Sequence, residues 1–126
     1  MFFENNVKKY FDFLVSEYGF SNPIFYNVAH ELHATYIKDD WFINIAFDGC
    51  YWCTIHKSRQ EIQNVLSGKI KINDMDYRKI KNYDISKLDK NKKVYNAISF
   101  NNISEKELLY YSTLLKNNPK ILNGDF

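Results

Sequence analysis

Apolar side chains near the start of the chain recur at the three- and four-residue spacing of one helix face. The pattern runs through residues 3–18, and charged side chains such as Lys8 and Asp12 fall between the apolar positions. Gly19 follows where a left-handed residue commonly ends a helix. The pattern therefore predicts an amphipathic helix over residues 3–18. Its expected buried face is Phe3, Val7, Tyr10, Phe11, Leu14, Val15 and Tyr18.

Residues 31–56 show the period-two alternation of strands. Asp48-Gly49 is a preferred two-residue hairpin turn, because both of its central positions must adopt positive φ. Asp39-Asp40 is placed for a second tight turn, although it lacks the glycine. Together the turns predict an antiparallel meander with one apolar face. The residues assigned to that face are Leu32, Ala34, Tyr36, Trp41, Ile43, Ile45, Phe47 and Trp52.

The two turns also fix the strand register. The first turn pairs Phe47 with Cys50 and Ile45 with Trp52, and the second pairs Lys38 with Trp41. The opposite face then holds a mixed set, which is Glu31, His33, Thr35, Ile37, Phe42, Asn44, Ala46, Asp48, Tyr51, Cys53 and Ile55. A mixed face is either partly covered by another element or left open with aromatic side chains available for contact.

The second half of the chain has weaker periodicity. Ser58 with Glu61 three positions later matches a capping box and predicts a short helix over residues 58–66. Residues 67–93 are polar and rich in lysine, so we expect a long excursion with little regular structure. Residues 94–100 are predicted as a further strand.

A second capping box begins at Ser104 and predicts a C-terminal helix that Pro119 ends. Its buried face is expected to be Leu108, Tyr111, Ser112 and Leu115, and the tail is expected to pack through Ile121, Leu122 and Phe126. The pattern as a whole predicts one α+β domain over residues 1–126. That domain has an N-terminal helix, an antiparallel meander sheet of about three to five strands, and a C-terminal helix.

Composition narrows the class of protein. A chain of 126 residues is one domain by its length, and its aromatic fraction of 17% is high enough to leave some aromatic side chains at the surface. Met1-Phe2-Phe3-Glu4 does not open an apolar signal segment, and no apolar run is long enough for a membrane span. Two cysteines do not make a secreted disulfide framework. We therefore expect a cytoplasmic protein.

The residues that usually carry chemistry are scattered by the predicted sheet. Cys50 and Cys53 lie three apart on a strand and point to opposite faces, which disfavours a redox or metal pair. His30 and His33 have the wrong spacing for a metalloprotease helix. His56 is expected at a strand end rather than as a general base. We predict no catalytic residue, no metal site and no cofactor. A zinc site shared by His30, His33, Cys50 and Cys53 would require the predicted sheet to be wrong.

Charge is unevenly distributed along the chain. The net charge is +2, but residues 1–65 carry five basic and eight acidic side chains, whereas residues 66–93 carry nine and four. Lys69, Lys71, Arg78, Lys79 and Lys81 interleave with Tyr77 and Tyr83. That segment gives an alternative function, a nucleic-acid-binding module that uses residues 67–93 for phosphate contacts and stacking. The other interpretation is a solvated loop region.

Three stretches of the chain together resemble a known kind of protein. They are YFDFLVSEYGF (Tyr10 to Phe20), WFINIAFDG (Trp41 to Gly49) and ELLYYSTLLKNNPKILNGDF (Glu107 to Phe126). In layout they resemble small cytoplasmic immunity proteins that accompany bacterial polymorphic toxins. The resemblance implies a protein that binds and blocks a cognate toxin without catalysis. It carries no contact residue over by position.

The leading hypothesis is therefore a non-catalytic binding protein with a toxin domain as its partner. Tyrosine and tryptophan anchor many interfaces, so this hypothesis expects a rigid aromatic surface rimmed by carboxylates. The candidate partner-binding residues are Asp39, Asp40, Phe42, Asp48 and Tyr51. The competing interpretation is that the segment 67–93 covers Phe42 and Tyr51. A third hypothesis is a small enzyme, which an enclosed pocket joining His30, His33 or His56 to a carboxylate would favour.

Overall fold

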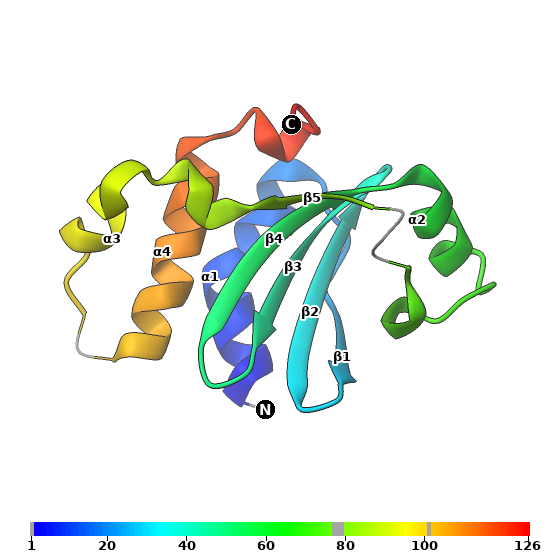
Figure 1. The fold of residues 1–126 in the computed structure, drawn as a ribbon, viewed down its shortest axis with the longest axis horizontal. Helices are drawn as coiled ribbons and strands as arrows, with labels where there is room; N and C mark the ends of the chain where they lie inside the picture. The colour runs from blue at the N-terminus through cyan, green and yellow to red at the C-terminus, as the bar shows by residue number, and fades with distance from the viewer. Residues whose placement is uncertain (1, 77–79, 101) are drawn as a thin grey trace.

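The computed structural model describes residues 2–76, 80–100 and 102–126, and its centre is one antiparallel sheet (Figure 1). The sheet has five strands in the order β1-β2-β3-β4-β5, so neighbours in sequence are neighbours in space. The strands are β1 (Ile24–Val28), β2 (Glu31–Lys38), β3 (Trp41–Phe47), β4 (Tyr51–Lys57) and β5 (Lys81–Asp84). Together with the terminal helices, this meander confirms the predicted α+β class.

Helices cover the two faces of the sheet unequally. α1 (Phe2–Tyr18) and α4 (Ile103–Asn117) lie side by side against one face, which we call the core face (Figure 1). α2 (Arg59–Leu66) lies on the opposite side, beside what we call the second face (Figure 1). The shorter helical segments are η1 (Ile72–Asp74), η3 (Ile85–Leu88), η4 (Lys90–Lys92), α3 (Lys93–Ala97) and η5 (Ile121–Asn123).

The main core fills the space between α1, α4 and the core face. The predicted N-terminal helix is confirmed, and Gly19 follows it with a φ of 75°. Phe11 and Leu14 from α1 are wholly buried, as are Ile43 and Ile45 from β3. Burying an apolar side chain of this size stabilises the fold by about 1.5–3 kcal/mol. The tail packs as predicted, with Ile121 and Leu122 buried and Phe126 half-buried.

The register between β2 and β3 agrees with the prediction, since Lys38 lies opposite Trp41. The predicted register between β3 and β4 is wrong by one residue: Phe47 lies opposite Tyr51, not Cys50. The connecting loop therefore spans Asp48, Gly49 and Cys50. Gly49 adopts a φ of 79°, whereas Asp48 does not adopt the positive φ that a two-residue turn requires.

Burial explains why the longer loop is preferred. It turns Tyr51, Cys53 and Ile55 toward the core face, and all three are buried. A one-residue slip exchanges the two faces of a strand, so the register that buries the more apolar set has the lower free energy. The other alternate set, which faces the opposite way, is Trp52, Thr54 and His56. The predicted place of Trp52 on the core face is therefore wrong.

Part of the second face is covered by α2 and the segment that follows it. Ser58 caps α2 as predicted, because its Oγ accepts a hydrogen bond from the Glu61 N–H at 3.3 Å. The Glu61 carboxylate does not complete the capping box; its Oε2 accepts from the Asp76 N–H at 3.0 Å. This bond holds the segment against the sheet. The covered cluster is Ile37, Phe42, Ile62, Met75 and Ile80.

The predicted strand over residues 94–100 is wrong, because α3 occupies the start of this range. The Asp89 carboxylate accepts hydrogen bonds from the N–H groups of Val94 at 2.8 Å and Tyr95 at 3.1 Å. A carboxylate that satisfies the free N–H groups of a first turn favours a helix there. The outer strands are instead β1 and β5, and β5 lies inside the segment expected to hold little regular structure.

The predicted C-terminal helix is confirmed as α4, which ends at Asn117 before Pro119. Leu108 and Leu115 on its predicted face are wholly buried. The predicted cap, Ser104, falls after the first residue of this helix, and its side chain lies outside the described part of the structure. Within the described ranges, no helix has the length and apolar character needed to cross a membrane.

Substitution of Gly124 by Ala should destabilise the fold more than the same change at Gly49. Both glycines have positive φ, which costs a side chain about 1–2 kcal/mol. At Gly124 an added Cβ would also lie 2.9 Å from the Trp41 ring, whereas at Gly49 it would meet nothing within 4 Å. Overpacking adds roughly 1–3 kcal/mol. Urea unfolding of both variants measures the difference, and equal losses would contradict the close approach.

Candidate functional site

A recess of about 410 Å³ opens on the second face, next to the part that α2 covers. We call it the second-face recess. Its floor comes from the sheet, and its wall on the α2 side comes from Asn73 in η1 and from Met75. The residues that line it are Tyr26, Val28, Glu31, His33, Asn44, Trp52, Thr54, His56, Asn73 and Met75.

Strand alternation places the central lining residues in one row. Tyr26 on β1 lies opposite His33 on β2, His33 opposite Ala46 on β3, and Ala46 opposite Trp52 on β4. Ala46, which is wholly buried, separates His33 from Trp52 in this row. The Tyr26 and His33 rings stack with centroids 5.2 Å apart, and the Trp52 ring meets His33 edge-on at 6.3 Å.

A chain of hydrogen bonds connects side chains of the recess and the sheet, from Tyr26 on β1 through β2 and β3 to Glu31 at the start of β2. The Tyr26 hydroxyl lies 2.8 Å from Thr35 Oγ1, and this Oγ1 donates to Asn44 Oδ1 at 3.2 Å. Asn44 Nδ2 lies 3.1 Å from His33 Nδ1, and His33 Nε2 lies 3.0 Å from Glu31 Oε1. Thr35 and Asn44 are buried, so these partners replace the water that they lose on folding.

The chain fixes the order of donors and acceptors. Thr35 gives its one hydroxyl proton to Asn44, so the Tyr26 hydroxyl donates to Thr35. The Glu31 carboxylate can only accept, so His33 Nε2 carries a proton and donates it to Glu31. His33 Nδ1 lies 3.1 Å from Asn44 Nδ2 and 3.4 Å from Asn44 Oδ1, and the shorter contact pairs it with the amide N–H as donor. Both ring nitrogens of His33 are therefore engaged inside the protein.

His56 lies at the covered end of the recess and is held in a similar way. Its Nε2 lies 2.7 Å from Thr54 Oγ1, its Nδ1 contacts Asn82 Oδ1, and its ring stacks on Phe42. Burial lowers the pKa of His56 because it penalises the charged imidazolium, and the hydrogen bond to Asn82 only partly opposes this. His56 is thus a buried neutral side chain of the wall.

The recess brings His33 and His56 together with the Glu31 carboxylate, as the enzyme hypothesis requires, but it is open to the surface and not an enclosed pocket. His30 lies apart from them, exposed in the turn between β1 and β2. Cys50 is exposed and Cys53 is buried in the main core, and both are free thiols. Among the residues that the structure describes, no group of three His, Cys, Asp or Glu side chains is placed to hold a metal ion.

The predicted contact residues do not form one surface. Phe42 is wholly buried, so its predicted exposure is wrong. It clusters with Ile62 of α2 and with Met75 and Ile80, so the segment 67–93 covers it together with α2, and the competing interpretation is correct for Phe42. Tyr51 is 3% exposed because the corrected register turns it into the main core, so its exposure is wrong too. Asp39 and Asp40 lie in the β2–β3 turn, and Asp48 lies in the loop at the other end of β3. Partner binding by Asp39 and Asp40 at one end of β3, and by Asp48 at the other end, remains a prediction.

The basic segment is only partly available as a binding surface. Lys69 and Lys71 are exposed, but Lys81 Nζ donates to the Phe126 carbonyl oxygen at 2.7 Å. Tyr83 is half-buried against the main core, which restricts stacking on a base. Tyr77, Arg78 and Lys79 lie outside the described residues. Nucleic-acid binding by this segment remains a prediction.

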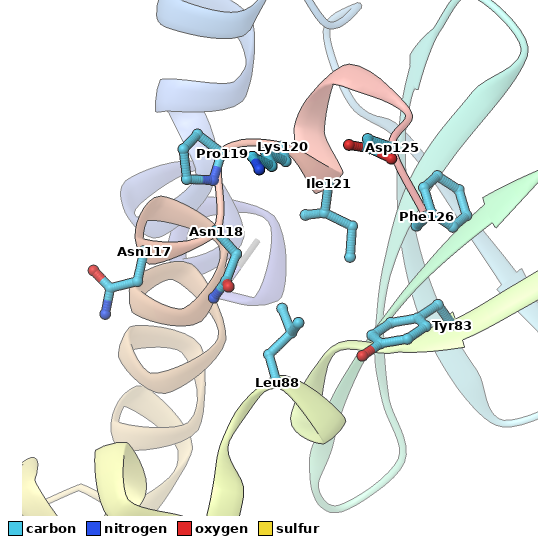
Figure 2. Close-up of a pocket in the computed structure, with 9 residues that line it drawn as sticks. All are labelled: Tyr83, Leu88, Asn117, Asn118, Pro119, Lys120, Ile121, Asp125 and Phe126. Atoms are coloured by element: carbon cyan, nitrogen blue, oxygen red, sulfur yellow. The ribbon is translucent and has the colours of Figure 1, made fainter.

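A second cavity, of about 460 Å³, lies between the end of α4, η3 and the tail (Figure 2). Figure 2 shows the Leu88 and Ile121 side chains pointing toward one another across it, whereas Asn117 points away. The tail itself forms one wall. Phe126 is held there by Lys57 and Lys81, whose ammonium groups lie 5.8 and 5.6 Å from its ring centroid. We therefore interpret this cavity as a space left where the C-terminal tail packs against η3 and the end of α4.

Sequence reasoning missed Tyr26, Glu31, His33 and Trp52 as a site. The signal that identifies them is the contrast between the two alternate sets of residues 51–57, one apolar and one containing Trp52 and His56. Weighing that contrast above the Asp48-Gly49 turn preference places Trp52 beside His33. Comparisons with protein-family models, curated proteins and solved structures give no significant match. The recess is therefore interpreted from its own chemistry.

Substitution of Thr35 by Val should destabilise the protein by roughly 1–3 kcal/mol, because it leaves the buried Asn44 oxygen without this donor. Thr113→Val on α4 is the matched control, since Thr113 is half-buried and its hydroxyl donates along its own helix, to the Leu109 carbonyl at 2.7 Å. We expect a loss below about 0.5 kcal/mol there. Urea unfolding measures both, and similar values would contradict the role given to Thr35.

The lowered pKa of His56 should make stability depend on pH. Below an unfolded pKa of 6.5 the unfolded chain protonates this imidazole more readily than the folded protein does. The free energy of unfolding should therefore fall as the pH drops from 6.5 toward the lower folded pKa. His56→Asn should show a shallower fall between about pH 7.5 and about pH 5.5 in urea unfolding. An unchanged slope would show that His56 does not contribute.

Proposed function

We propose that this chain is a non-catalytic cytoplasmic protein that neutralises a cognate bacterial toxin by binding it stoichiometrically, and that the second-face recess is part of the contact surface. The resemblance to immunity proteins supplies the class of partner. The recess supplies a surface with the character of an interface, because Tyr26 and Trp52 are half-buried rather than enclosed in the core.

The observation that carries this proposal is the engagement of both histidines. His33 and His56 each have both ring nitrogens within hydrogen-bond distance of protein groups. A general base must instead present a nitrogen to the proton that it removes. What the recess offers outward is aromatic surface and the Glu31 carboxylate, whose side chain is 38% exposed. These groups suit binding better than turnover.

The pairing of Glu31 with His33 favours a second candidate, an enzyme in which His33 is the general base. A carboxylate that orients an imidazole is a recurring catalytic arrangement. In that case Asn44 would have to rotate away from Nδ1 when substrate enters. The two candidates differ in stoichiometry, since a binding protein is consumed at one equivalent whereas an enzyme turns over.

Co-expression with the C-terminal domain of the toxin encoded beside this chain should give a complex that co-elutes in size-exclusion chromatography and restores growth. Titration of the toxin domain should reach full inhibition at one equivalent, because binding alone is required. Trp52→Ala should weaken the complex by about 2 kcal/mol or more. Leu66→Ala, at an exposed site on α2, is the control.

Failure to form any complex would reject the pairing with a toxin. Progressive inactivation of excess toxin by a small amount of the protein would instead support the enzyme. Equal binding by the Trp52 and Leu66 variants would move the contact surface away from the recess.

A further inference from the structure

Glu31 gives the described part of the second-face recess its charge. Among the described residues that line it, Glu31 is the carboxylate, and none is a lysine or an arginine. The floor of the recess is built from β1 to β4, within residues 1–65, which carry five basic and eight acidic side chains. Its Asn73 and Met75 wall belongs to residues 66–93, which carry nine basic and four acidic side chains. An incoming cation would meet the complementary charge of the Glu31 carboxylate, whereas an anion would meet repulsion from it.

The Glu31 carboxylate has capacity for a second partner. Oε1 accepts the hydrogen bond from His33 Nε2 at 3.0 Å, which orients the carboxylate. Among the described residues, none forms a hydrogen bond with Glu31 Oε2, and the Glu31 side chain is 38% exposed. A carboxylate fixed through one oxygen presents the other to a donor without further ordering.

The remaining walls suit a planar cation on an apolar stem. Tyr26 and Trp52 supply aromatic rings, and such rings attract cations through their negative faces. Val28 and Met75 supply apolar surface on which methylene groups can pack. Thr54 and Asn73 add oxygen acceptors.

We propose that the second-face recess binds the guanidinium group of an arginine side chain presented by the partner protein, an inference that rests on the binding function proposed above. Arginine fits better than lysine, because its flat group stacks on aromatic rings and its paired N–H groups match a carboxylate. The recess volume of about 410 Å³ accommodates one such side chain. Glu31 pairs with the cation, and His33 is a positioning residue for Glu31.

The first test uses the full chain and a small probe. N-acetyl-arginine amide should shift the backbone and side-chain NMR signals of Glu31, His33 and Trp52, with a dissociation constant of about 1 mM. N-acetyl-citrulline amide is the matched control, because citrulline keeps the shape of arginine but lacks its charge. Glu31→Gln should abolish the response to arginine while keeping the fold, since its amide oxygen still accepts from His33. An equal response to both probes, or none, would overturn the inference.

The second test uses the toxin domain. Glu31→Gln should weaken the complex by about 10-fold to 100-fold. Glu17→Gln, at an exposed site on α1, should leave it unchanged. Replacing the responsible toxin arginine by Gln should produce the same loss, with no further loss when combined with Glu31→Gln.

The two proposals fail in different ways. If the toxin domain binds tightly but Glu31→Gln has no effect and the arginine probe shifts nothing, the recess inference is wrong and the proposed function stands. If the arginine probe binds at Glu31 but no toxin domain forms a complex, the recess inference stands and the toxin pairing is wrong.

Discussion

The register between β3 and β4 is the constraint on which both faces of the sheet depend. With Phe47 opposite Tyr51, strand β4 sends its apolar alternate set into the main core and its polar set to the second face. A shift of one residue would bury His56 and Thr54 among apolar side chains of α1 and α4 without partners. The same register that completes the core also places Trp52 beside His33. Core packing and the recess are therefore products of one loop length.

The two faces are stabilised by different physics. Apolar burial dominates between the core face and the terminal helices, where Ile43, Ile45 and Leu115 are wholly buried. On the second face a small apolar cluster covers one end. Elsewhere on this face, hydrogen bonds between side chains satisfy the buried polar groups of Thr35, Asn44 and His33. The Glu61 carboxylate fixes the edge of the covered part, because it accepts a hydrogen bond from the Asp76 N–H and so holds the segment after α2 against the sheet. Beyond that edge the face is open as the recess.

Much of the fold could be predicted from local patterns. The helix at the N-terminus, the Ser58 cap and the β2–β3 register follow from spacing and turn chemistry, and all are confirmed. The β3–β4 register could not be read from the Asp48-Gly49 turn, because long-range burial outweighs the preference of two residues. The helix α3 depends on the Asp89 carboxylate, which accepts hydrogen bonds from the N–H groups of Val94 and Tyr95. Strand propensity, on which the prediction for residues 94–100 rests, does not include such a contact. The recess combines side chains from four strands and from the segment after α2, so no single stretch of sequence predicts it.

The hydrogen-bond chain from Tyr26 to Glu31 has a thermodynamic consequence for any association on this face. The three inner side chains, Thr35, Asn44 and His33, have hydrogen-bond neighbours on both sides before a partner arrives. Tyr26 and Glu31 are each anchored from one side. Immobilising a free polar side chain at an interface costs roughly 0.5–1.5 kcal/mol. Here that entropic cost is met during folding. The free protein is thus already rigid at this surface, and association loses little conformational freedom on its side.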